Sequence, residues 1–210
     1  MKKREVLASV KDEKLIEMRR DQIIKGAVNL FKDKGFHRTT TREIAKSAGI
    51  GFGTLYHYIR QKEDVLYLVC DKLYDQVHSL LEQGIDTKQG TIESLKQAMK
   101  IYFKVIDEMQ DEVLILYQET KSLSKDALPY VLDKEIAMTN MFKSIIDSCV
   151  KNGELNLSEK ESELIAHNIT VSGEMWSFRR WGLQKRFAID EFVALQLNIF
   201  IKAVTNPNDF

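Results

Sequence analysis

The sequence predicts an all-α fold. Apolar residues recur at helical spacing along most of the 210 residues, and only two prolines and ten glycines interrupt the pattern. No apolar run reaches the roughly 18 residues that a membrane-spanning helix needs, so we expect a soluble, cytoplasmic protein without a membrane partner. The pattern predicts two domains: a small helical domain at residues 1–64 and a larger helical domain at residues 65–210.

Two helices are expected before residue 50. The first spans about residues 12–34, and Gly35 is suited to end it, with Phe36 folding back on Phe31. The second begins after Thr40, because Thr40 and Glu43 have the spacing of a capping box. Both helices carry apolar residues on an inner face, which predicts that this face of each helix is buried.

A short third helix is expected from Gly51 or Phe52, after a sharp turn at Gly49. Its outer face carries aromatic, hydroxyl and imidazole side chains, which suit contacts with base edges and phosphates: Phe52, Thr54, Tyr56, His57 and Tyr58. Two short helices joined by a glycine-bearing turn form a helix-turn-helix, so the segment 40–62 predicts binding to double-stranded DNA. A helical hairpin with these aromatic side chains in its core is the alternative.

Charge is unevenly distributed along a chain that is neutral overall. Residues 1–64 contain nine Lys and six Arg against nine acidic residues, a net charge of +6, and residues 65–210 therefore carry −6. A positive end on a negative body attracts phosphate to one face, although ordinary scatter also produces such asymmetry.

At these positions the sequence resembles the TetR family of bacterial transcriptional regulators. The resemblance covers roughly residues 20–70, and it rests on motifs in the family's order and spacing: Phe31-x-x-x-Gly35-Phe36, Thr39-Thr40-Thr41-x-Glu43-Ile44-Ala45, Ala48-Gly49-Ile50, Gly53-Thr54-Leu55-Tyr56-x-Tyr58 and Lys62-Glu63.

The resemblance implies a set of DNA contacts at the second and third helices: Thr40, Thr41, Arg42, Phe52, Gly53, Thr54, Tyr56, His57 and Tyr58, with Lys62 on a phosphate. Two residues depart from the family pattern. Gly51 stands where a serine cap is frequent, and Phe52 where a polar or basic residue is. Since Phe52 cannot donate a hydrogen bond to a base, any reading by this residue is apolar contact.

Further helices are expected across the larger domain, near residues 61–82, 91–108, 112–123, 125–152, 158–182 and 189–205, with a polar break between Gly84 and Gly90. The resemblance implies that these helices form a ligand-binding and dimerisation body, in which ligand binding moves the helix that joins it to the DNA-binding head. Such a change is a rigid-body shift between two states that bind the ligand differently.

A lipophilic pocket is expected in this body, lined by soft apolar and aromatic side chains around a few polar ones. The candidate residues are Tyr102, Phe103, Leu116, Tyr117, Glu119, Met138, Phe142, His167, Val171, Glu174 and Phe178. An ordinary core, with each buried His or Glu bonded to a neighbour, explains the same pattern.

The segment 175–182 contains two Trp and two Arg. Such residues can stack guanidinium on indole at a helix end or clamp an anionic group. The segment resembles, loosely, TetR regulators that respond to fatty acyl-coenzyme A thioesters, whose lipid tail and anionic head suit such surroundings. A dimer-interface anchor is the alternative, because Trp and Arg are enriched in interfaces.

The last helix is apolar nearly all round, which predicts packing on its own core and on a second copy of the chain. The expected interface residues are Trp176, Trp181, Phe192, Leu195, Ile199 and Phe200. In such a homodimer, two DNA-binding heads contact half-sites about 34–36 Å apart or a multiple of this distance.

The sequence thus predicts a homodimeric, ligand-responsive transcriptional repressor that binds a palindromic operator and is released by a small, lipophilic inducer. No catalytic dyad, metal-spaced Cys or His, or phosphate-cradling loop is present, so we expect no enzyme activity, no cofactor and no metal. Cys70 and Cys149 stand singly in apolar stretches, which is typical of buried thiols. A regulator of drug efflux, an activator, and a non-regulatory all-α ligand-binding protein remain alternatives.

Overall fold

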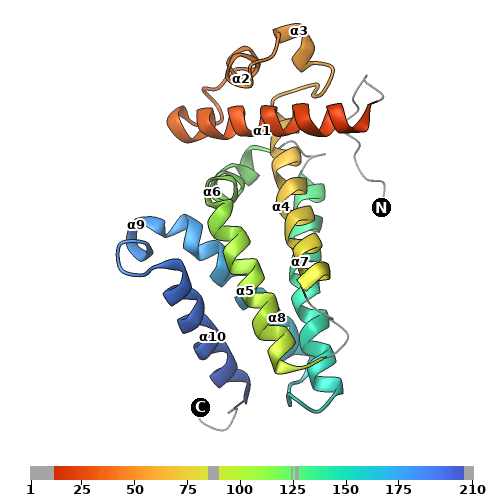
Figure 1. Ribbon diagram of the computed structural model, residues 1–210, viewed down its shortest axis with the longest axis vertical. Coiled ribbons are helices and arrows are strands. Elements are labelled where there is room, and N and C mark those ends of the chain that lie inside the picture. The colour runs from red at the N-terminus through yellow and green to blue at the C-terminus, as the bar shows by residue number, and fades with distance from the viewer. Residues whose placement is uncertain (1–11, 85–89, 124, 126–127, 206–210) are drawn as a thin grey trace. The chain divides into compact units, whose positions relative to one another are not determined.

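The computed structural model describes residues 12–84, 90–123, 125 and 128–205, and within these ranges the chain forms helices and no strands (Figure 1). The predicted all-α fold is confirmed. The helices are α1 (Glu13–Lys34), α2 (Thr41–Ser47), α3 (Phe52–Leu55), α4 (Glu63–Gly84), α5 (Ile92–Glu108), α6 (Gln110–Glu119), the 3₁₀ helix η1 (Thr120–Ser122), α7 (Leu128–Lys151), α8 (Glu159–Phe178), α9 (Arg180–Leu183) and α10 (Ile189–Thr205).

The chain divides into two compact units. The first extends to Leu73 and also includes Leu114–Lys134, and the second comprises Tyr74–Val113 and the chain from Glu135 onward. The division into a DNA-binding domain at 1–64 and a ligand-binding and dimerisation domain at 65–210 is a division by function, and it stays a prediction.

The ends of α1 follow the sequence signals. The Asp12 carboxylate accepts a hydrogen bond from the backbone N–H of Leu15 at 3.2 Å. Gly35 ends the helix with φ +85°, and the rings of Phe31 and Phe36 then meet edge to face with centroids 5.1 Å apart. This aromatic contact directs the chain from α1 toward the start of α2.

A capping box begins α2, as the sequence predicts. The Thr40 hydroxyl accepts from the N–H of Glu43, and the Glu43 carboxylate accepts from the N–H of Thr40 at 2.9 Å. Lys34 forms an ion pair with the same carboxylate. This partner, together with the Thr40 hydrogen bonds, lowers the pKa of Glu43 to about 2, so the box stays intact at any physiological pH.

Helices α1 and α2 approach closely at Gly26. A Cβ atom at this position would lie 2.8 Å from the backbone nitrogen of Ala48 and 3.0 Å from the carbonyl carbon of Ser47. Because these are backbone atoms, no side-chain rotation relieves the contact, and only glycine fits. Gly49 then takes φ +67° and turns the chain toward α3.

Segments distant in sequence complete the first unit. The rings of Tyr67 in α4 and Tyr130 in α7 lie 5.5 Å apart, and Lys134 forms an ion pair with Asp71 at 3.1 Å. The Ser122 hydroxyl also lies 3.1 Å from the ring nitrogen Nε2 of His37. These contacts explain why residues 114–134 belong with α1–α3 and the first half of α4.

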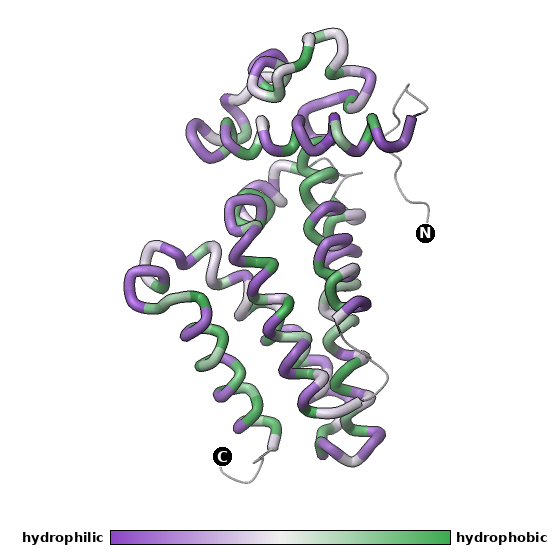
Figure 2. Tube along the Cα trace, viewed as in Figure 1, coloured by the Kyte–Doolittle hydropathy of each residue, from purple (hydrophilic) through white to green (hydrophobic). Residues whose placement is uncertain are grey.

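The core of the second unit is built on α5, α8 and α10. The Tyr102 hydroxyl of α5 donates to the Thr170 carbonyl of α8 at 3.0 Å. Gly173 allows this approach, since an added Cβ would overlap the Tyr102 ring. Trp176 of α8 and Phe192 of α10 stack with centroids 4.8 Å apart. Figure 2 shows apolar residues along much of α10.

Some predicted boundaries were wrong. The expected single helix at 158–182 ends at Phe178, because Arg179 leaves helical geometry (φ −107°, ψ 18°), and α9 is separate. The expected helix at 112–123 is α6, starting at Gln110, followed by η1. Helix α4 lies two residues later than expected and includes Gly84, while residues 85–89 of the predicted break and residues 126–127 of the helix predicted at 125–152 lie outside the described residues.

We expect Gly26→Ala to lower the free energy of unfolding by about 1–3 kcal/mol, because the added methyl group pushes α1 away from the backbone of Ala48. Chemical denaturation followed by circular dichroism, at fixed protein concentration, measures this loss. Gly53→Ala is the matched control, since nothing lies within 4 Å of its Cβ position. Equal stability of the two variants would contradict the close approach.

Candidate nucleic-acid interface and ligand site

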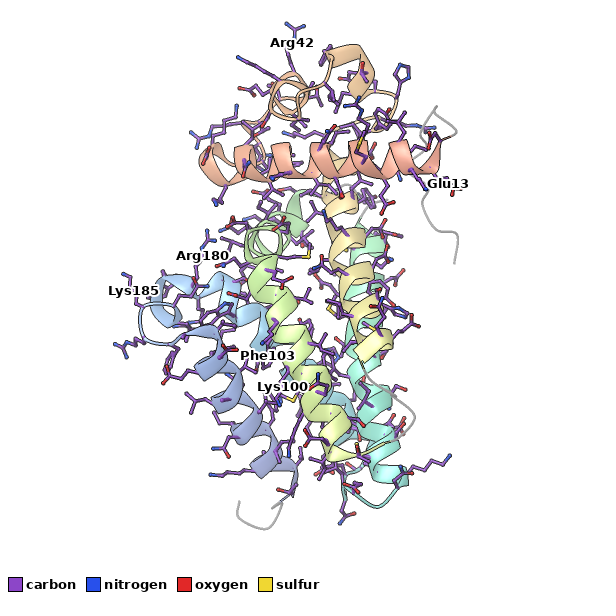
Figure 3. All side chains as sticks on the ribbon, viewed as in Figure 1. Glu13, Arg42, Lys100, Phe103, Arg180 and Lys185 are labelled. Carbon is purple, nitrogen blue, oxygen red and sulfur yellow. The ribbon has the colours of Figure 1, made fainter. Side chains whose placement is uncertain are left out.

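The start of α2 presents three of the predicted DNA contacts at the surface. Thr40 and Arg42 are exposed and Thr41 is partly exposed. The Thr41 hydroxyl lies 3.1 Å from the Tyr56 hydroxyl, which joins α2 to the residue that ends α3. Arg42 points away from the helix into solvent (Figure 3).

Helix α3 adds an exposed aromatic surface. Phe52 and Tyr56 are 41% and 45% exposed, and their rings meet edge to face with centroids 5.2 Å apart. The Arg42 guanidinium carbon lies 5.1 Å from the centre of the Phe52 ring, so an aromatic ring of α3 holds a cation of α2. Gly53, Thr54 and His57 are also exposed.

Tyr58 is placed differently from its neighbours. Its side chain is 3% exposed and belongs to the core of the first unit. In this conformation the Tyr58 ring cannot contact DNA directly. The remaining predicted contacts on α2 and α3 are accessible, and we call them the reading surface: Thr40, Thr41, Arg42, Phe52, Gly53, Thr54, Tyr56 and His57.

The Lys62 ammonium group is engaged inside the head. Its Nζ donates to the carbonyl oxygens of Phe36, His37 and Thr39 at 2.7, 3.3 and 3.0 Å, and it lies 4.2 Å from the centre of the Phe36 ring. An ammonium group has three N–H donors, and here each has a carbonyl acceptor. The phosphate contact implied by the resemblance stays a prediction, and it requires one of these hydrogen bonds to be exchanged.

In the second unit, four of the predicted pocket residues belong to the core. Tyr102, Phe103, Met138 and Phe142 are each buried, and the Tyr102 and Phe142 rings meet with centroids 5.2 Å apart. The geometry is that of a packed aromatic cluster on α5 and α7.

A pair of carboxyl groups accompanies this cluster. Glu174 is partly buried and Glu135 keeps an exposed side chain. Desolvation, and secondly the charge of Glu135, raises the pKa of Glu174 to about 7, and partial desolvation raises the pKa of Glu135 above its usual value. At neutral pH, Glu174 is therefore protonated in a large fraction of molecules and can donate a hydrogen bond. The sequence had identified Glu174 but not Glu135, because two carboxyl groups on different helices share no sequence pattern.

The other predicted pocket residues are distributed over both units. Leu116, Tyr117 and Glu119 belong to the first unit, where Glu119 accepts from the Ser122 hydroxyl at 2.8 Å and Tyr117 is exposed. On α8, His167 and Val171 are exposed, whereas Phe178 is partly buried.

Of the Trp and Arg residues after Met175, two bind aspartates of neighbouring helices and two lie together at the surface. The Trp176 indole donates to Asp107 at 2.6 Å, and Arg180 forms an ion pair with Asp111, so both hold α8 and α9 to the junction of α5 and α6. Trp181 is exposed, with the Arg179 guanidinium carbon 5.5 Å from its ring centre. Sequence reasoning missed both aspartates, although a buried Trp N–H signals a nearby acceptor.

The six predicted dimer residues also separate into two groups. Trp176 and Phe192 are buried within the unit, while Trp181, Leu195 and Ile199 are exposed and Phe200 is partly exposed. Leu195 and Ile199 are one helical turn apart on α10, at 43% and 61% exposure. They form one apolar stripe that this chain leaves uncovered.

The described residues offer neither a metal site nor a membrane-spanning helix. No group of three or more His, Cys, Asp or Glu side chains there is arranged to hold a metal ion. Within the same ranges, none of the helices is long and apolar enough to cross a membrane. Cys70 and Cys149 are free and buried, and burial raises the pKa of Cys149 to about 11.

Comparison with known proteins matches both parts of the chain. The family model of bacterial regulatory proteins, tetR family, matches residues 23–67, and the model of the tetracyclin repressor-like C-terminal domain matches residues 88–173. The first match spans the helix-turn-helix, and the second spans α5, α6, η1, α7 and most of α8.

Individual regulators are similar over long stretches. The chain is 29% identical over 197 residues to the HTH-type transcriptional regulator HbdR of Aromatoleum sp. (strain CIB), covering 94% of this chain and 85% of HbdR. It is 31% identical over 136 residues to the HTH-type transcriptional repressor KstR2 of Mycolicibacterium smegmatis, covering 64% and 66%.

The fold is also that of a solved regulator. The crystal structure of AibR in complex with isovaleryl coenzyme A and operator DNA aligns with a TM-score of 0.68 at 18% identity, covering 86% of this chain and 97% of AibR. Since the head, the body and the fold agree, the chain belongs to the tetR family of bacterial transcriptional regulators.

Proposed function

We propose that this protein is a ligand-responsive transcriptional repressor that binds a palindromic operator as a homodimer in the cytoplasm and is released by a lipophilic inducer. The observation that carries the proposal is the α2–α3 surface, where Arg42, Phe52 and Tyr56 are exposed side by side on a head with net charge +6. Positive charge attracts phosphates, and exposed side chains of a helix-turn-helix contact base edges.

A gel-shift assay with the promoter beside the protein's own gene tests DNA binding directly. We expect a shift that unlabelled promoter DNA competes away and unrelated DNA of equal length does not. Equal competition by both DNAs would contradict a sequence-specific regulator and favour a non-specific DNA-binding protein.

Exposed apolar side chains on α8 and α10 support the homodimer. Leu164 and Val171 on α8, with Leu195 and Ile199 on α10, are 43–61% exposed although all are aliphatic. Covering such surface with a second copy removes it from water, and a two-fold axis places the same helices of both copies face to face. A dimer with two heads matches a palindromic operator.

Tyr102, Phe142 and Glu174 support a lipophilic inducer with a neutral acceptor group. The aromatic cluster supplies apolar contacts, and a protonated Glu174 donates a hydrogen bond. An acyl thioester has this chemistry: an apolar chain and a carbonyl oxygen without charge. The isovaleryl coenzyme A bound by AibR is such a thioester, and basic residues after α8, including the outward-pointing Lys185 (Figure 3), suit its phosphates.

We expect Lys62→Ala to lower the free energy of unfolding by about 1.5–3 kcal/mol and to weaken operator binding, because three carbonyl groups before α2 lose their charged donor. Thermal melting and operator titration measure the two effects. Lys46→Ala, at an exposed position of α2, is the control for stability. If Lys62 also contacts a phosphate, the slope of log K against log salt falls by about one. Unchanged stability and affinity would contradict its role in the head.

We expect the double variant Leu195→Glu/Ile199→Glu to be a folded monomer that binds the operator at least about 100-fold more weakly, because buried carboxylates oppose each other across the interface. Analytical ultracentrifugation measures the oligomeric state, and circular dichroism verifies folding. Met18→Glu adds charge at an exposed apolar residue of α1 and serves as the control. A dimer that survives the double substitution would place the interface elsewhere.

We expect Glu174→Gln to stabilise the protein at pH 8 by on the order of 2 kcal/mol, with little effect at pH 5. The folded pKa of about 7 lies above the usual 4.5, so stability is lost as pH rises between these values, because the unfolded chain releases this proton while the folded chain still holds it. The glutamine variant has no charge to bury. Melting temperatures from pH 5 to 8 test this, with Glu163→Gln on the exposed side of α8 as control. Parallel pH profiles of the wild type and Glu174→Gln would exclude a buried carboxyl group.

A further inference from the structure

The reading surface contains one continuous chain of side-chain contacts across α2 and α3. The Thr41 and Tyr56 hydroxyl groups are hydrogen-bonded at 3.1 Å, and the Tyr56 and Phe52 ring centroids lie 5.2 Å apart. The Arg42 guanidinium carbon lies 5.1 Å from the Phe52 centroid. Both ends of the chain of contacts start from adjacent residues of α2. The two rings are therefore held between fixed points, and their exposed edges form a defined apolar surface.

This surface is unusual in being apolar on a positively charged head. Phe52 and Tyr56 each leave more than two fifths of their area in water, which has a cost unless a partner covers it. On a partner rich in phosphate, few apolar groups are available. In the major groove of DNA, the apolar group on a base edge is the 5-methyl group of thymine.

The Arg42 guanidinium is oriented by the same contact. The Phe52 ring contacts one side of the guanidinium group. Among the described residues, Arg42 has no hydrogen-bond or ion-pair partner. Its N–H donors are therefore available in a restrained position, which is the requirement for a bidentate contact to guanine O6 and N7. The open space at Gly53, where no atom lies within 4 Å of the Cβ position, lets a base edge approach α3.

We propose that Phe52 determines operator specificity by covering the 5-methyl group of a thymine in each half-site, while it holds Arg42 on a neighbouring guanine. The inference rests on the proposed DNA-binding function and names the base chemistry that this surface recognises. A phenylalanine has no donor or acceptor, so its discrimination is between a thymine with its methyl group and the same base without it.

The experiment removes the thymine methyl group and the Phe52 ring separately. Wild-type protein first selects binding sites from a random double-stranded library, and each thymine of the selected site is then replaced by deoxyuridine, which lacks only the methyl group. We expect one replacement per half-site to weaken wild-type binding about three- to tenfold. Phe52→Ala should bind the thymine and deoxyuridine sites equally, because the ring that covers the methyl group is gone.

Two further variants separate the roles of ring and cation. Phe52→Leu keeps an apolar side chain but no π face, so it should retain part of the methyl preference and lose discrimination at the guanine. Arg42→Ala should lose about ten- to a hundredfold at the guanine position and keep the deoxyuridine penalty. Lys46→Ala, on the same helix, is the matched control and should select the wild-type site.

The outcomes distinguish the inference from the proposed function. If wild-type protein enriches no sequence, both fail. If it enriches a site in which no thymine is sensitive to loss of its methyl group, or if Phe52→Ala keeps the full penalty, the inference alone is overturned. Circular dichroism of Phe52→Ala verifies that the exposed ring was not needed for folding.

Discussion

The positive charge of Lys62 is the constraint on which the DNA-binding head depends. Its ammonium group connects the residue before α4 to the segment between α1 and α2, across more than twenty residues of sequence. The Thr39 carbonyl group accepts from this ammonium group at 3.0 Å, and a partly buried carbonyl group without a donor costs free energy. One cation thus joins the residue before α4 to the segment before α2, while the capping box at Thr40 determines where α2 begins.

Local signals predicted much of the fold, and contacts between distant residues account for the rest. The capping box at Thr40, the end of α1 at Gly35 and the last helix at 189–205 depend on neighbours within a few positions, so the sequence pattern suffices. The burial of Tyr58 and the Asp107 acceptor of Trp176 depend on which helices meet. Periodicity predicts an inner face for a helix but does not identify the helix that covers it.

The body shows how a polar group in an apolar core shapes ligand preference. Burial, with the charge of Glu135 as a second cause, raises the pKa of Glu174 to about 7, so this carboxyl group is protonated in a large fraction of molecules near neutrality and can donate a hydrogen bond. A ligand with a neutral carbonyl group gains from that proton, whereas a carboxylate in the same place meets a negative neighbour. A ligand shifts an equilibrium only through such a difference in affinity between two states. Helices α4, α6 and α7 each contribute residues to both compact units.

Charge and apolar contact divide the tasks of DNA recognition on this head. Lysine and arginine contacts with phosphates form on DNA of any sequence. They weaken as the salt concentration rises, because the release of counterions from the DNA then contributes less free energy to binding. A contact between Phe52 and a methyl group releases no ion, so salt leaves it largely unaffected. As ionic strength rises, total affinity therefore falls while the discrimination supplied by the aromatic surface persists. A regulator that carries phenylalanine where a charged residue is frequent thereby exchanges some affinity for specificity at physiological salt.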